Sequence, residues 1–78
     1  MWKELDLARL HTTPLGERRI RQNLGLPEDT DPVGYCRELI SGGCEVKIKG
    51  KNHYFSADGV RITVNSRSLT IITAHKVG

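Results

Sequence analysis

The spacing of apolar side chains changes near the middle of the chain. Before residue 43 they recur every three or four positions, the period of an amphipathic helix, and after it they alternate with polar residues, as in a strand with one buried face. A chain of 78 residues can bury only one sizeable hydrophobic core. The pattern predicts a single α+β domain over residues 1–78, with a helical half at 1–42 and an antiparallel β-meander at 43–78.

Three helices are predicted in the first half, and residues that favour helix ends mark two of them. Thr13 can cap a helix that carries Pro14 at its first position, and Gly25 supplies its stop. Asp31 can cap a third helix, which Gly42-Gly43 ends because consecutive glycines lose too much backbone entropy to remain helical. The predicted helices span 2–10, 14–24 and 32–41.

Four strands are predicted in the second half, separated by short polar turns. Asp58-Gly59 suits a tight hairpin, because its residues tolerate positive φ angles. The adjacent Ile71 and Ile72 imply that the last strand is partly covered on both faces or carries an apolar spot on its outer face. The predicted strands span 45–49, 52–56, 60–65 and 69–75. We expect the three helices to pack on one face of this four-stranded sheet, in two layers.

The composition favours a soluble, cytoplasmic protein. Two cysteines are too few for a disulfide framework and suit reduced thiols. No apolar run approaches the roughly 20 residues that cross a bilayer, so we expect no membrane partner. We expect neither metal nor cofactor, because no phosphate-cradling glycine loop is present and the possible zinc ligands lack close pairs. Those ligand types are at Cys36, Cys44, His53 and His75.

The net charge of +3 is concentrated in the second half of the chain. Residues 1–39 hold six basic and seven acidic side chains, whereas residues 40–78 hold six basic and two acidic ones. If the alternating apolar residues of the strands point inward, Lys47, Lys49 and Arg61 share the outward face of the sheet. Such cations attract phosphates. An antiparallel sheet covered on one side has a polar outer face in any case, so the charges are also compatible with an ordinary solvated surface.

This outward face is the candidate site, and its composition depends on the register of the second and fourth strands. If Tyr54 points inward, His53 and Phe55 point outward, and an RNA base could stack on the ring of Phe55. His75 and Thr73 join the face only if the last strand also turns them outward. The candidate nucleic-acid-binding residues are Lys47, Lys49, Phe55, Arg61 and Lys76.

A sharper hypothesis for the same surface is RNA cleavage without a metal. A base would deprotonate the 2′-hydroxyl, an acid would protonate the leaving oxygen, and a cation would stabilise the phosphorane between them. The candidate catalytic residues are His53, Arg61, Thr73 and His75. A rival function is a protein-interaction or homodimerisation module without activity, in which Tyr54, Phe55 and Ile71 or Ile72 form an apolar patch. The sequence leaves open whether the protein is an enzyme.

Several segments resemble an uncharacterised family of small bacterial proteins. They are GKNHY at 50–54, ITVN at 62–65 and TIITAHK at 70–76. This resemblance implies a bacterial cytoplasmic protein and carries no assigned activity, so it transfers no functional residue. The order of helices followed by an antiparallel meander also resembles, in architecture alone, the barnase, colicin and RelE-like ribonuclease toxins.

Overall fold

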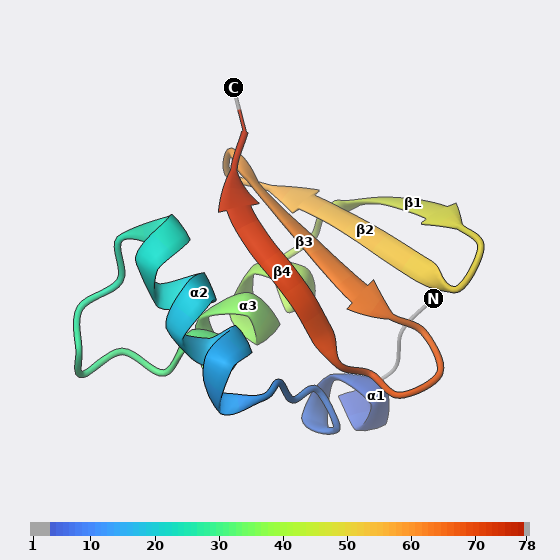
Figure 1. Cartoon of the computed structure of the whole chain (residues 1–78). Helices are drawn as coiled ribbons and strands as arrows, with labels where there is room; N and C mark the ends of the chain where they lie inside the picture. The colour runs from blue at the N-terminus through green and yellow to red at the C-terminus, as the bar shows by residue number, and fades with distance from the viewer. Residues whose placement is uncertain (1–3, 78) are drawn as a thin grey trace.

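Three helices precede four strands in the computed structural model, which describes residues 4–77 (Figure 1). The helices are α1 (Glu4–Ala8), α2 (Pro14–Leu24) and α3 (Pro32–Ser41). The strands are β1 (Glu45–Lys49), β2 (Asn52–Ala57), β3 (Val60–Asn65) and β4 (Ile71–Lys76). The α+β class is therefore confirmed. No helix in the described part of the chain is long and apolar enough to cross a membrane.

The caps expected from the sequence define α2 and α3. The Thr13 side chain accepts a hydrogen bond from the backbone N–H of Gly16 at 3.0 Å, and Gly25 ends α2 with a left-handed φ of 65°. Asp31 accepts from the N–H of Val33 at 3.2 Å in the same way. Helix α1 is shorter than predicted and ends at Ala8, while the predicted start at residue 2 lies outside the described residues.

The strands form one antiparallel sheet in the order β1-β2-β3-β4. Two-residue turns join the first three strands, at Gly50-Lys51 and at Asp58-Gly59. The φ angles of Asp58 and Gly59 are 50° and 73°, which is the positive-φ pair that a tight hairpin requires. The meander predicted from the alternating pattern is thus present.

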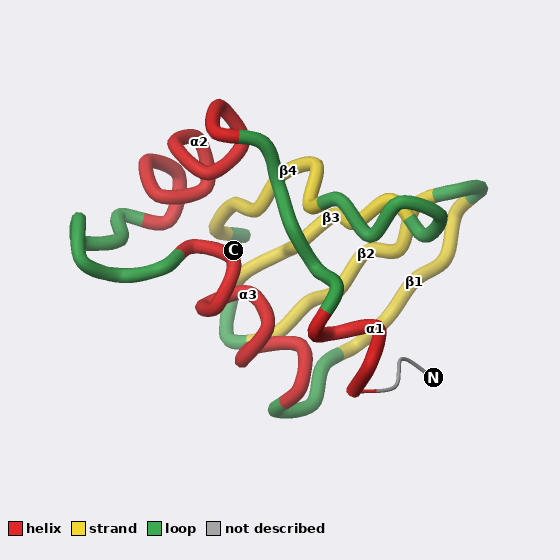
Figure 2. The backbone as a smooth tube through the Cα atoms, turned by 90° about the horizontal axis from the view of Figure 1, so that it is seen from below, coloured by secondary structure: helices red, strands yellow, loops and turns green. Residues whose placement is uncertain are grey.

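One core joins the helices to a single face of the sheet. The helical half contributes Leu10, Ile20, Leu24, Cys36 and Ile40, and the sheet contributes Phe55, Val60, Ile62, Val64, Ile71 and Ala74. The strand residues are cross-strand neighbours on the face that we call the inner face. Seen from below, the helices lie along this side of the sheet (Figure 2). The opposite surface is called the outer face.

The edge of β4 that does not pair with β3 is covered by the N-terminal half of the chain. His11 forms a parallel bridge with Thr70, in which the His11 N–H donates to the carbonyl of Leu69 at 3.2 Å and the N–H of Ile71 donates to the His11 carbonyl at 2.8 Å. Further along the strand, the Asn23 amide of α2 donates to the carbonyl of Ala74 at 3.3 Å. This edge is consequently not available to another strand.

Candidate nucleic-acid interface

The register of the sheet arranges the outer face in rows that cross the strands. Residues directly opposite one another in an antiparallel pair point to the same face. The first row contains Glu45, Ser56, Arg61 and His75; the second contains Lys47, Tyr54, Thr63 and Thr73; the third contains Lys49, Asn52 and Asn65. The outer face is therefore polar throughout, with three cations and one aromatic ring.

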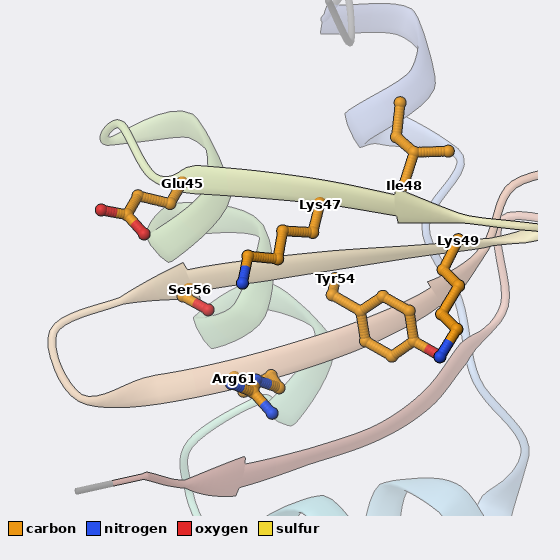
Figure 3. Close-up of a pocket in the computed structure, with 7 residues that line it drawn as sticks. All are labelled: Glu45, Lys47, Ile48, Lys49, Tyr54, Ser56 and Arg61. Carbon is orange, nitrogen blue, oxygen red and sulfur yellow. The ribbon is translucent and has the colours of Figure 1, made fainter.

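An open hollow of about 640 Å³ lies on this face over β1, β2 and β3. Lys47, Lys49 and Arg61 are exposed along it, while Tyr54 is half-buried. Glu45 and Ser56 also line the hollow, and Ile48 borders it although its side chain points to the inner face. Figure 3 shows Lys47, Tyr54 and Arg61 on one side of the sheet and Ile48 projecting away from them. The three cations outnumber the one carboxylate, so the hollow favours anions.

The face predicted for His53 and Phe55 is wrong. Because the Gly50-Lys51 turn has two residues, Lys49 faces Asn52, and the alternation along β2 then turns Tyr54 outward. Phe55 is only 2% exposed and lies in the core. The His53 ring lies on the same inner face, edge-on to Phe55 at a centroid distance of 6.1 Å. A site with two histidines on the outer face is thus not formed.

Strand β4 adopts the alternative that turns Thr73 and His75 outward. His75 is directly opposite Arg61, and Thr73 is opposite Thr63. A bulge makes this possible, since Ile71 pairs with Val64 and Ile72 is the additional residue. Ile71 is 1% exposed and Ile72 is 47% exposed, which explains why two adjacent isoleucines occur in one strand.

Lys76 is not on the outer face, where it was predicted. It is opposite Val60, a residue of the inner face, so it does not share a surface with Lys47, Lys49 and Arg61. Among the five predicted nucleic-acid-binding residues, the structure brings together those three cations. Tyr54 replaces Phe55 as the aromatic residue of the outer face.

The apolar patch expected for a protein-interaction module is not formed in its predicted composition. Phe55 and Ile71 belong to the core, which leaves Tyr54 and Ile72 at the surface.

The cysteine thiols are poorly suited to nucleophilic chemistry. Burial, with a smaller contribution from the charge of Asp31, raises the pKa of Cys36 from 9.0 to about 12. Burial also raises the pKa of Cys44. Among residues 4–77 no group of three or more potential metal ligands is brought together.

The fold and the outer face define a small α+β protein with a polar, basic sheet surface. The family described as "Protein of unknown function (DUF3781)" matches residues 5–75, and the chain belongs to this family. This match agrees with the resemblance to a family without an assigned activity and lends no support to the likeness to ribonuclease toxins. Neither the curated proteins nor the solved structures contain a match.

Proposed function

We propose that the outer face binds single-stranded nucleic acid, with RNA as the ligand to test first. The main support for the proposal is the register of the sheet. It is consistent with one open hollow lined by Lys47, Lys49, Arg61 and Tyr54. Cations that neutralise phosphates and a ring on which a base can stack are the two components that recur in binding sites for single strands.

The spacing of the cations suits an extended polyanion. Lys47 and Lys49 are two residues apart on β1, which corresponds to about 6.8 Å along a strand. Arg61 lies two strands away, at a lateral distance of about 9.6 Å. All three side chains are long and exposed, so they can reach neighbouring phosphates of one strand. The exposed lysines at the sheet edge supply attraction, and they do not by themselves select a sequence.

Tyr54 provides the second component. It lies between Lys47 and Thr63 in the second row, in the middle of the sheet surface. Every nucleobase has a π-face, so stacking on this ring tolerates any sequence and requires an unpaired base. A duplex would not expose its bases to such a ring, which favours single strands as ligands.

The proposal does not include cleavage. His75 is beside Arg61, but His53 is on the inner face and cannot complete an acid and base pair with it. Glu45 is at the other end of the first row, three strands from His75 and therefore about 14 Å away. This separation is too large for both groups to act on one phosphate.

Fluorescence anisotropy with a labelled oligouridine tests the proposal. Three phosphate contacts to a single strand predict a slope of log K against log salt of about −2, so affinity should fall about 20-fold between 50 and 200 mM salt. Tyr54→Ala should lower affinity roughly 5- to 150-fold, corresponding to the loss of one stacked base, whereas Tyr54→Phe should retain it. An affinity that does not respond to salt would refute the proposal.

A matched pair of lysines controls for net charge. Lys49→Ala removes a cation from the outer face, and Lys76→Ala removes one from the inner face. The first variant should reduce the salt slope by about 0.7, and the second should leave it unchanged. Equal effects of the two substitutions would show attraction to overall charge and would count against the outer face as the site.

A further inference from the structure

We infer that a second copy of this chain pairs with the open edge of β1, forming a symmetric dimer with a continuous eight-stranded sheet. The inference is independent of the proposed nucleic-acid binding and starts from the two edges of the sheet. Within residues 4–77, β1 pairs only with β2, whereas the edge of β4 is covered by His11 and Asn23. Open edge strands are templates for pairing with another chain.

The backbone of β1 is prepared for such pairing. Lys49 faces Asn52 across the two-residue turn, so these two residues close the hairpin as a hydrogen-bonded pair. The alternation of an antiparallel ladder then directs the N–H and C=O groups of Val46 and Ile48 toward the open edge. Ile48 is also 64% exposed although it belongs to the inner face, and a neighbouring strand would cover it.

The side chains of β1 select a second copy in one register. When two β1 strands run antiparallel with Lys47 on the two-fold axis, Glu45 of each copy is opposite Lys49 of the other, and Val46 is opposite Ile48. This register pairs all five residues of the strand and gives two opposite-charge pairs and two apolar pairs. The two Lys47 side chains are its single like-charge pair.

The neighbouring registers are less favourable. An axis at Ile48 places Lys47 opposite Lys49 twice, and like charges directly opposite one another are destabilising. An axis at Val46 also gives two opposite-charge pairs, because it places Glu45 opposite Lys47 twice. It pairs fewer residues of the strand, however, since Ile48 is then opposite Cys44 and Lys49 opposite Gly43, and both of these lie before the strand begins. The axis at Lys47 is therefore the one that uses the full strand.

Charge reversal tests this arrangement by analytical ultracentrifugation. Wild type should show a concentration-dependent monomer–dimer equilibrium. Glu45→Lys places two lysines opposite one another, and Lys49→Glu places two glutamates opposite one another, so each variant alone should weaken the dimer at least about tenfold. In an equimolar mixture every reversed residue meets an opposite charge, and a heterodimer of wild-type strength should form.

Circular dichroism of each variant alone establishes that it is folded. A wild type that remains monomeric at the highest attainable concentration overturns the inference. So does a dimer that neither substitution weakens, because it must use another surface. Two variants that are folded and monomeric but do not associate when mixed also overturn it. None of these measurements contains nucleic acid, so failure here leaves the proposed function to its own test.

Discussion

Replacing Phe55 with alanine should remove much of the free energy that holds the domain together. The side chain is 2% exposed and is a member of the cluster that joins the helices to the inner face. Truncating a buried phenylalanine typically costs about 3–5 kcal/mol, through lost burial and the cavity that remains. A chain of 78 residues has roughly 4–12 kcal/mol in total at ~0.05–0.15 kcal/mol per residue. The midpoint of thermal unfolding should accordingly fall by roughly 12–40 °C.

Urea denaturation followed by circular dichroism measures this loss, and Tyr54→Ala is the matched control. The two aromatic residues are neighbours in β2 but point to opposite faces, and Tyr54 is half-buried on the outer face. Tyr54→Ala should therefore cost only about 1 kcal/mol, a usual value for a single replacement. If Tyr54→Ala unfolds the domain while Phe55→Ala retains wild-type stability, β2 is shifted by one residue and the composition of the outer face is wrong.

Three further predictions concern the thiols, a helix cap and the centre of β1. At pH values well below 9, a thiol whose pKa is about 12 holds roughly 1000-fold less thiolate than an ordinary thiol at 9.0. Burial raises the pKa of Cys44 too, but Cys44 is half-buried whereas Cys36 is fully buried, so an aromatic disulfide reagent should label Cys36 more slowly than Cys44; equal rates would contradict the burial. Asp31→Ala should lower the free energy of unfolding by about 1 kcal/mol in urea titrations, whereas Asp29→Ala, in the exposed loop, should have little effect. Lys47→Thr removes the like-charge pair of the inferred dimer and one phosphate contact of the outer face. It should therefore tighten the dimer in sedimentation and weaken oligouridine binding in anisotropy; a change of both affinities in the same direction would contradict these two roles of Lys47.

Helices α2 and α3 were predictable from the sequence because their limits are set locally, whereas the end of α1 was predicted two residues too late. Thr13, Gly25 and Asp31 each act within a few residues of the backbone groups that they satisfy, and the structure shows these contacts. The alternation of β3 is equally local, so the buried positions of Val60 and Ile62 followed directly from the pattern. In these segments the sequence signal and the final structure depend on the same short-range interactions.

The composition of the candidate site was harder to predict because it depends on register. For β2 the signal was present: a two-residue turn that places Asn52 opposite Lys49 also places Phe55 opposite Val46, and both then point inward. For β4 no local signal was available. The bulge at Ile72 and the bridge between His11 and Thr70 are set by contacts between segments that are distant in the chain. Predicting which side chains face outward on this strand therefore required the tertiary structure.

The two proposals meet at Lys47. In the inferred dimer the two Lys47 side chains face each other on the outer face, which weakens the free dimer but concentrates positive charge at the two-fold axis. A nucleic acid that contacts both copies would bind the dimer more tightly than the monomer. Thermodynamic linkage then requires the nucleic acid to tighten the dimer by the same factor. A different outcome is that RNA binds and the dimer forms, but RNA does not tighten the dimer and dimerisation does not tighten RNA binding. The RNA must then bind each copy away from the two-fold axis, nearer to Arg61 and His75 than to Lys47.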